Sequence, residues 1–175
     1  RILSSKTKIN MFPLNSETHT RIILVGKAAS GKDHLRKRFE KQGFSFACTY
    51  TTRPPREGEK NGEDYFFVHE EKAQELIDNG NFYEYVKFNG WIYGRTKKQF
   101  WEHNLFIMTP GGISQITEED RKKSFIIYLD APMDIRRTRL TNRHMPGDNL
   151  QRRIEADEID FADFTDYDLR ITNAD

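Results

Sequence analysis

Short apolar runs alternate with longer charged stretches along the chain from Arg21 onward. The runs at 21–25, 105–108 and 125–129 are dominated by Ile, Leu, Val and Phe, which is typical of strands buried on both faces. The stretches between them place apolar residues three or four positions apart among charges, which is the spacing of amphipathic helices. The pattern predicts helices over 32–43, 70–79, 114–123 and 150–161.

The middle of the chain follows a different pattern, with short extended segments between turn residues. Strands are expected at 44–50 and 65–68, separated by a charged loop that contains prolines. Two further runs, 82–88 and 91–93, flank an Asn-Gly pair, which supplies the positive φ values of a tight hairpin turn. Alternating strands and helices predict an α/β fold, a parallel sheet with helices on both faces, in which these middle hairpins form an insertion.

Composition narrows the range of partners. A length of 175 residues suits one domain, and 28 basic against 27 acidic residues give a net charge of +1, so no bulk attraction to nucleic acid or an acidic membrane is expected. Apolar runs such as 125–129 are far shorter than the roughly 18 residues of a membrane helix, so no membrane partner is expected. The single Cys48 allows no internal disulfide and suits a reducing, cytoplasmic setting. Residues 1–20 lack periodicity and are interpreted as a tail or tag, with Met11 as a candidate native start.

A phosphate-binding loop is indicated where the first strand meets the first helix. Residues 26–32 read Gly-Lys-Ala-Ala-Ser-Gly-Lys and fit the P-loop pattern G-x-x-x-x-G-K. The glycines let successive backbone N–H groups turn around phosphate oxygens, the helix N-terminus adds a positive dipole, and Lys32 can reach the terminal phosphates. Asp33 follows, where Ser or Thr usually offers a hydroxyl to Mg²⁺. The predicted ATP-binding residues are Gly26, Lys27, Ala28, Ala29, Ser30, Gly31, Lys32 and Asp33.

A second anion site is indicated one helix further along the chain. Arg53 and Arg56 lie three positions apart, so their guanidinium groups can grip one phosphate from two sides. The hydroxyls of Tyr65 and Tyr93 can complete the hydrogen bonds to the remaining phosphate oxygens.

These residues belong to a longer motif. Residues 51–68 read Thr-Thr-Arg-Pro-Pro-Arg-Glu-Gly-Glu-Lys-Asn-Gly-Glu-Asp-Tyr-Phe-Phe-Val and closely resemble the signature of guanylate kinases. Glu84-Tyr85 and Tyr93-Gly94 follow at that family's distances, and the resemblance extends over about 21–175. It implies a P-loop NTPase-type parallel sheet flanked by helices, with a small mixed acceptor-binding insertion and a helical lid.

The resemblance also implies boundaries and a reaction. The core would comprise 21–48, 104–135 and 165–175, the acceptor-binding insertion about 49–103, and the lid about 136–164. The expected reaction transfers the γ-phosphoryl of ATP to GMP or dGMP with Mg²⁺, so the expected partners are small-molecule nucleotides. The sequence indicates no oligomeric state.

Roles for individual side chains follow from the same resemblance. Arg53, Arg56, Tyr65 and Tyr93 would hold the acceptor's phosphate, while other residues would recognise guanine. A carboxylate at Glu84 can accept from guanine N1–H and the 2-amino group, and a hydroxyl at Thr49 can donate to O6. The predicted GMP-binding residues are Thr49, Arg53, Arg56, Tyr65, Glu84, Tyr93 and Thr109.

A basic stretch near the C-terminus has two interpretations. From charge alone it is a solvated helical face. Under the resemblance, Arg139, Arg143 and Arg153 close over the donor phosphates, with Met145-Pro146-Gly147 as a mobile connection. With Lys32 they are the predicted catalytic residues, because arginines neutralise charge on the transferring phosphoryl group.

The chain departs from the family pattern at several positions. Ile107 and Thr109 stand where an Asp-x-Asp pair is usual, and Arg95 stands where a small hydroxyl residue is common. A further C-terminal helix usually follows the position of Asp175. We hypothesise that Asp33 replaces the carboxylate lost at Ile107, on Mg²⁺ directly or through its water shell.

Two other functions fit parts of the pattern. A kinase of another phosphorylated acceptor, such as ribose 1,5-bisphosphate or a broader range of deoxynucleotides, agrees with Asp33 after the P-loop lysine and with Thr109. A non-catalytic guanylate-kinase-like module that binds phosphopeptides would use the acceptor site alone. The intact Gly31-Lys32 favours an enzyme, and the complete acceptor motif favours GMP or dGMP.

Overall fold

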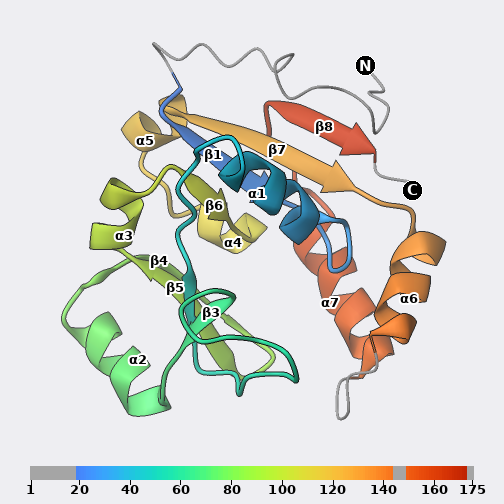
Figure 1. The fold of residues 1–175 in the computed structure, drawn as a ribbon, viewed down its shortest axis with the longest axis horizontal. Helices are drawn as coiled ribbons and strands as arrows, with labels where there is room; N and C mark the ends of the chain where they lie inside the picture. Colours follow the sequence, from blue (N-terminus) through green and yellow to red (C-terminus); the bar gives the residue numbers. More distant parts are fainter. Residues whose placement is uncertain (1–18, 144–148, 173–175) are drawn as a thin grey trace.

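The computed structural model describes residues 19–143 and 149–172. The tail predicted at 1–20, except for its last two residues, and the connection predicted at 145–147 lie outside the described residues. Figure 1 shows two groups of strands, one crossing the upper part of the molecule and one at the lower left, with helices around both.

The first sheet is the predicted parallel sheet. Its strand order is β6-β1-β7-β8, and each pair of neighbours is parallel. The register places Ile23 beside Phe106 on one side and beside Ile126 on the other. The strands are β1 (Arg21–Val25), β6 (Leu105–Ile107), β7 (Ser124–Asp130) and β8 (Leu169–Thr172). The edge strand β8 has no apolar run long enough for the sequence pattern to indicate it.

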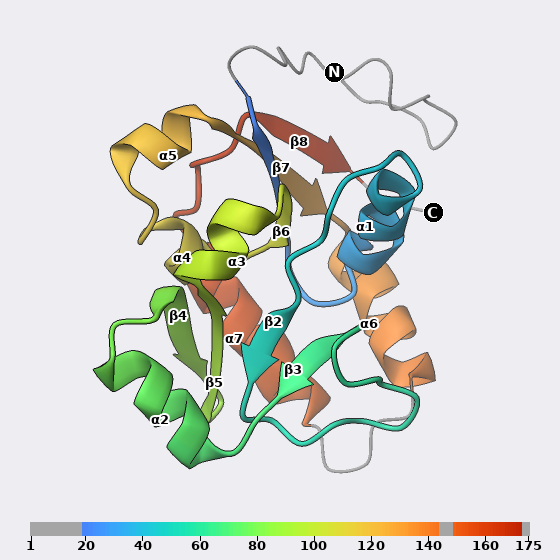
Figure 2. The same cartoon turned by 60° about the vertical axis from the view of Figure 1, so that its left-hand side comes forward.

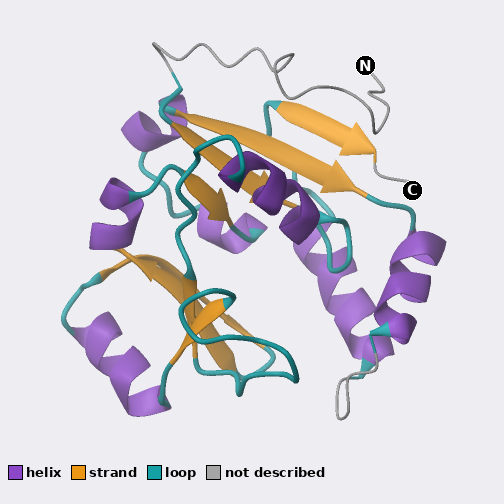
Figure 3. Cartoon of the chain, in the orientation of Figure 1, coloured by secondary structure: helices purple, strands orange, loops and turns teal. Residues whose placement is uncertain are grey.

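Helices cover both faces of this sheet, as the apolar runs predict. Ile22 and Leu24 point to one face and pack with Phe39 of α1 (Lys32–Glu40). Ile23 and Val25 point to the opposite face, where Phe100 of α3 (Lys97–Glu102) belongs to the same cluster. Figure 3 shows helices on either side of the upper strands. Burying each such side chain stabilises the fold by about 1.5–3 kcal/mol.

The first helix is shorter than the predicted 32–43. It begins after Gly31, whose φ of 101° is left-handed, and it ends at Glu40. Gln42 and Gly43 donate their N–H groups to Phe39 O and Glu40 O, which closes a turn, and Gly43 has a φ of 94°. The chain therefore leaves the helix three residues before the expected end.

The second sheet has the order β3-β2-β5-β4 and carries the hairpin that the Asn-Gly pair predicts. Asn89 and Gly90 have φ values of 53° and 82° at its tip. Its outer face is covered by Ala73 and Leu76 of α2 (Glu70–Asp78). The strands are β2 (Thr49–Thr51), β3 (Tyr65–Phe67), β4 (Phe82–Phe88) and β5 (Trp91–Thr96).

Two predictions in this part are wrong in their bounds. The strand expected at 44–50 is reduced to an isolated bridge between Phe46 and Leu105, and β2 begins only at Thr49. The second arm of the hairpin runs three residues beyond 93, to Thr96, whose side chain and Gln99 form a capping box that begins α3.

The single helix predicted at 114–123 is also wrong. Two short helices, α4 (Pro110–Ile113) and α5 (Glu118–Lys122), stand in this region. Each begins at a threonine whose hydroxyl accepts a backbone N–H, Thr109 from Gly112 and Thr117 from Asp120. A hydroxyl that caps a new helix stabilises that start, which explains the break.

Two helices complete the fold on the side of the P-loop. They are α6 (Met133–Asn142) and α7 (Leu150–Phe161), and they lie side by side in Figures 1 and 2. The helix α7 matches its predicted range of 150–161. Among the described residues, none of the helices has the length and apolar character needed to cross a membrane.

Candidate active site

One cavity of about 200 Å³ brings together residues that are far apart in the sequence. The P-loop lies at one end, the second sheet at the other, and α7 along a side. We call it the central cavity. The predicted site residues that line it are Gly26, Ala28, Lys32, Thr49, Arg53, Arg56, Tyr65, Glu84, Tyr93, Thr109 and Arg153.

The P-loop has the tight geometry that its glycines predict. A Cβ atom on Gly26 would lie 2.4 Å from Leu129 O, so a larger residue would collide with β7. Ala29 also has a positive φ, 60°, in this loop. Lys32 Nζ donates to Gly26 O at 2.6 Å and to Lys27 O at 2.9 Å, so the loop curls around its own ammonium group.

The charge of Lys32 depends on this enclosure. Burial lowers the pKa of Lys32 to about 8, although the nearby carboxylates of Asp157 and Asp33 oppose the shift. The positive charges of Arg153 and Arg143 lower the pKa further. Two of the predicted lid arginines therefore lie within electrostatic range of the P-loop lysine, and Arg139 Nη1 donates to Ala29 O at 3.0 Å.

Two carboxylates of α7 contact the P-loop, and sequence reasoning missed both. Asp157 Oδ2 accepts from Ala28 N at 2.8 Å, and Glu158 Oε2 accepts from Lys27 Nζ at the same distance. Buried Arg136 of α6 also donates to Glu158 Oε1, at 2.9 Å. In the sequence these groups look like the solvated face of a charged helix. The contact shows that Ala28 N, an amide of the loop, donates to a carboxylate oxygen.

Arg53, in the acceptor half of the cavity, is held by a partner that the sequence analysis did not single out. Its Nη2 and Nη1 donate to the two carboxylate oxygens of Glu59 at 2.9 and 3.0 Å. Glu59 Oε2 also accepts from Arg56 N at 2.7 Å. Burial alone would raise the pKa of Glu59, but the hydrogen bonds from Arg53 and Arg56 outweigh it and lower the pKa. The carboxylate thus joins both arginines of the motif in one arrangement.

The two tyrosines of the motif stand beside this pair. The Arg53 guanidinium lies 5.1 Å from the ring centroid of Tyr65, and the rings of Tyr65 and Tyr93 meet edge to face at 6.2 Å. Burial raises the pKa of Tyr65, so its hydroxyl stays protonated and available as a donor. Arg53, Tyr65 and Tyr93 therefore form one cluster.

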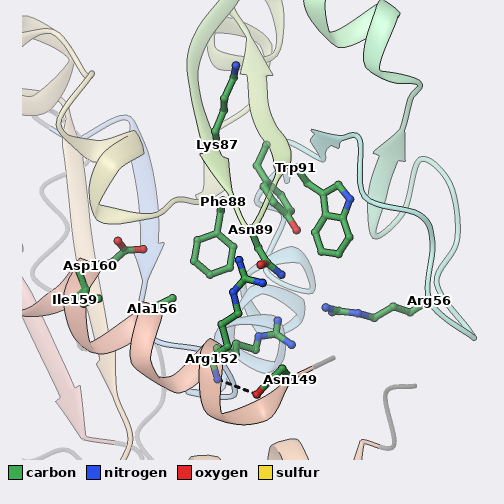
Figure 4. Close-up of a pocket in the computed structure, with 12 residues that line it drawn as sticks. Arg56, Lys87, Phe88, Asn89, Trp91, Asn149, Arg152, Ala156, Ile159 and Asp160 are labelled. Carbon is green, nitrogen blue, oxygen red and sulfur yellow. Dashed lines mark hydrogen bonds between the residues drawn. The ribbon is translucent and has the colours of Figure 1, made fainter. Parts of the chain in front are cut away.

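A second cleft of about 350 Å³ lies outside the central cavity, between the tip of the β4–β5 hairpin and α7. Figure 4 shows Phe88 and Trp91 on the hairpin, Arg152 on the helix, and Arg56 pointing toward the opening from its loop. Arg56, Tyr93 and Arg153 line both spaces, so the cleft is continuous with the central cavity.

The residues predicted to meet the base also line the central cavity. Thr49 and Glu84 are buried there, and Glu84 Oε1 accepts from Nη1 of buried Arg95. Thr109 is exposed, and its hydroxyl accepts from Gly112 N at 3.1 Å as the cap of α4. The sequence singled out Arg95 as a departure but gave no sign that it pairs with Glu84.

Asp33, the candidate metal ligand, lies in the first turn of α1 with 74% of its side chain exposed. Its Oδ1 is 3.6 Å from Arg36 Nε, and its charge acts on Lys32 and on Tyr65. In the described ranges, 19–143 and 149–172, no group of three or more His, Cys, Asp or Glu residues could hold a metal ion. Asp33 is thus an exposed carboxylate beside the P-loop.

Comparisons with known proteins bear on the family and the fold of this chain. The model of the guanylate kinase family matches residues 18–175. Guanylate kinase from Sus scrofa is 29% identical over 165 residues, covering 87% of this chain and 83% of that protein, and the one from Nostoc sp. is 31% identical, covering 88% and 82%. The crystal structure of guanylate kinase from Anaplasma phagocytophilum has the same fold, with a TM-score of 0.68 and 22% identity over 90% of this chain and 78% of that one. Because the family model spans most of the sequence, this chain belongs to the guanylate kinase family.

Proposed function

We propose that the protein transfers the γ-phosphoryl group of ATP to GMP or dGMP, giving ADP and the nucleoside diphosphate. The observation that carries the proposal is the central cavity, which Lys32 of the P-loop lines together with Arg53 and Tyr65 of the acceptor motif. Donor and acceptor phosphates that share one cavity can react in line, without a covalent intermediate. The curated guanylate kinases that resemble most of the chain support the same reaction.

At the donor end, the P-loop amides and Lys32 would hold the ATP phosphates. The carboxylate of Asp157 on Ala28 N supports this role, because an oxyanion already sits on a loop amide. We propose that ATP displaces this carboxylate and that Lys32 then exchanges its bonds to Gly26 O and Lys27 O for phosphate oxygens.

At the acceptor end, the monophosphate would be held by Arg53, Arg56, Tyr65 and Tyr93. Arg53 Nη1 donates to Glu59 and to Pro54 O, and Nη2 donates once to Glu59, which leaves Nε and the second Nη2 hydrogen to point at a phosphate. The same carboxylate fixes the guanidinium plane, so the arginine is oriented before the acceptor arrives. The base would lie against Thr49 and Glu84, with Thr109 at the rim.

The lid arginines would act on the transferring group. Arg139 donates to Ala29 O of the P-loop, and the charges of Arg143 and Arg153 act on Lys32. Cations near the donor phosphates would neutralise the charge that develops on the phosphoryl oxygens. We accordingly propose the division into a core at 21–48, 104–135 and 165–175, an acceptor-binding insertion at about 49–103 and a lid at about 136–164.

Mg²⁺ is proposed to arrive with ATP. It is commonly held by one or two carboxylates together with substrate phosphates and waters, so Asp33 beside the P-loop fits such a site. When bound, the metal would offset the negative charge of the phosphate oxygens. A cytoplasmic setting is proposed from the single, buried Cys48, which suits a reducing compartment.

The test is ADP formation with Mg-ATP and a panel of acceptors, namely GMP, dGMP, dTMP and ribose 1,5-bisphosphate, beside a control without acceptor. The account predicts turnover that depends on GMP or dGMP. Turnover with ribose 1,5-bisphosphate alone would identify that compound, and not GMP or dGMP, as the acceptor. If no acceptor supports turnover, a module that binds phosphopeptides would be the better interpretation.

A further inference from the structure

Glu84 and Arg95 form a pair that faces the end of the central cavity. They are cross-strand partners of the β4–β5 hairpin, so their side chains lie on the same face of the second sheet. Arg95 Nη1 donates to Glu84 Oε1, and each residue is only 3% exposed. Both line the central cavity beside Thr49 and Thr109.

The pair changes what the pocket offers to a base. A buried carboxylate and a buried guanidinium balance each other's charge, and neither is stable there without the other. Gly112 of α4 lies close to Glu84 Oε2, since a Cβ atom added to that glycine would come within 2.8 Å of the oxygen. The pocket therefore presents a donor beside an acceptor, where an unpaired glutamate would present two acceptor oxygens.

Arg95 has hydrogen-bonding capacity to spare. In the described part of the chain, its Nε is buried and has no hydrogen-bond partner. An unsatisfied buried donor costs free energy until it meets an acceptor. A small rotation of the guanidinium against a ligand oxygen would satisfy it.

The Watson–Crick edges of the purines differ in the order of their hydrogen-bond donors and acceptors. Guanine and hypoxanthine both present N1–H beside C6=O, which complements an acceptor beside a donor. Adenine presents the reverse, an acceptor at N1 beside an amino donor at C6. Guanine differs from hypoxanthine by its 2-amino group, which needs one more acceptor. The Ile107 side chain offers none, and the bond from Gly112 N takes one of the two acceptor positions of the Thr109 hydroxyl oxygen.

We propose that Arg95 and Glu84 together recognise the N1–H and C6=O edge and make no hydrogen bond to the 2-amino group. The acceptors are then 6-oxopurine nucleoside monophosphates with or without that amino group, which adds IMP and dIMP to GMP and dGMP. This inference rests on the proposed function, because it assumes that the central cavity holds the acceptor.

The decisive measurement is kcat/KM of the wild-type protein for GMP, IMP and AMP at saturating Mg-ATP. We expect IMP to lie within about tenfold of GMP, the effect of at most one ordinary hydrogen bond. AMP should be at least about 100-fold poorer, because its edge opposes donor to donor and acceptor to acceptor. IMP as poor as AMP, with GMP well used, would overturn the inference and leave the proposed function standing. No turnover with any monophosphate would overturn the proposed function itself.

The variant Arg95→Ser tests whether the Arg95–Glu84 pair sets the relative use of GMP and IMP. It frees both oxygens of Glu84 for guanine N1–H and the 2-amino group, so the GMP/IMP ratio of kcat/KM should rise by about tenfold or more, the effect of one charge-assisted hydrogen bond. The matched control, Arg137→Ser, removes an exposed arginine of α6 and should leave the ratio unchanged. A folded Arg95→Ser protein with the wild-type ratio contradicts the role of Arg95. If loss of the buried partner prevents folding, the wild-type ratio alone decides.

Discussion

The two ends of the central cavity bind anions by different means. At the P-loop the contact comes from the backbone, as the carboxylate on Ala28 N illustrates. At the second sheet the contacts come from side chains, and one replacement, Arg95, alters the partner of Glu84. A backbone site keeps its ligand chemistry through substitution, whereas a side-chain site changes its chemistry with a single residue.

Both ends also hold a carboxylate of the chain itself. Asp157 accepts a hydrogen bond from the P-loop amide of Ala28, and Glu59 accepts hydrogen bonds from Arg53. The first comes from another element, α7, and can leave with it, whereas the second lies six residues from its partner in the same loop. We therefore expect Asp157 to compete with a ligand and Glu59 to orient one.

The largest effect is expected at Lys32, whose side chain adds a positive charge to the backbone contacts of the P-loop. Lys32→Ala should lower kcat by about 10³-fold or more, on the scale measured for a cation that contacts the transferring phosphoryl group. The measurement is ADP formation with GMP, with circular dichroism as a check of the fold. Lys37→Ala, at an exposed position of the same helix, is the control and should keep wild-type activity. Near-full activity of Lys32→Ala would refute the role of the P-loop.

At the side-chain site, Arg53→Lys tests the bidentate geometry. A lysine keeps the charge but cannot span both oxygens of Glu59 and a phosphate, so KM for GMP should rise about 10- to 150-fold, the value of one charge-assisted hydrogen bond. KM for ATP should change little in the same assay. Equal rises in both constants would mean that Arg53 supports the fold and does not select the acceptor.

The pH dependence of ATP use separates the two ends without mutation. The pKa of Lys32 is lowered from 10.5 to about 8, so the ammonium is charged below that pH and loses its proton above it. The value of kcat/KM for ATP should be flat below pH 8 and fall about tenfold per pH unit above it. Lys32→Arg should move the fall well above pH 10, because arginine stays protonated.

The same pKa difference affects stability in the opposite direction. Between about pH 8 and 10.5 the unfolded chain binds more protons at Lys32 than the folded protein, so this group's contribution to the free energy of unfolding rises with pH. A fall in activity in this range accompanied by unfolding would point to a different titrating group.

The smallest effect is expected from Asp157→Asn. Without the charge, ATP displaces a weaker partner from Ala28 N, so KM for ATP at pH 7 should fall about 2- to 10-fold, the range of one hydrogen bond. The pKa of Lys32 should also drop, because Asp157 raises it, and the fall of kcat/KM should begin at a lower pH. A rise of KM at pH 7 would instead make Asp157 a positive contributor to ATP binding.

The sequence predicted the local features well, for physical reasons that are themselves local. The P-loop needs glycine at position 26 because a Cβ atom there would meet Leu129 O, and the hairpin turn needs positive φ at Asn89 and Gly90. Such requirements restrict the residue type at each position, so they can be recognised in a single sequence. The strands β1 and β7 could be predicted because burial likewise restricts their positions to apolar residues.

What could not be predicted depends on contacts between distant segments. The bond from Asp157 to Ala28 N joins residues 129 positions apart, and Arg95 meets Glu84 only because the hairpin register pairs them. The prediction of one helix at 114–123 was wrong because the Thr117 hydroxyl caps the start of a new helix. Nothing in the charge pattern of these residues indicates that break. A sequence does not distinguish a charged side chain that faces solvent from one that pairs with a distant residue.

The claim that both phosphates meet in the central cavity has a direct test. An inhibitor that links adenosine and guanosine through five phosphates can bind tightly only if both sites open into the same space at the right separation. By titration calorimetry, we predict a Kd at least about 100-fold below that of ATP or GMP alone, the gain expected when the second binding event becomes intramolecular. A Kd no lower than that of the tighter single nucleotide would contradict the account.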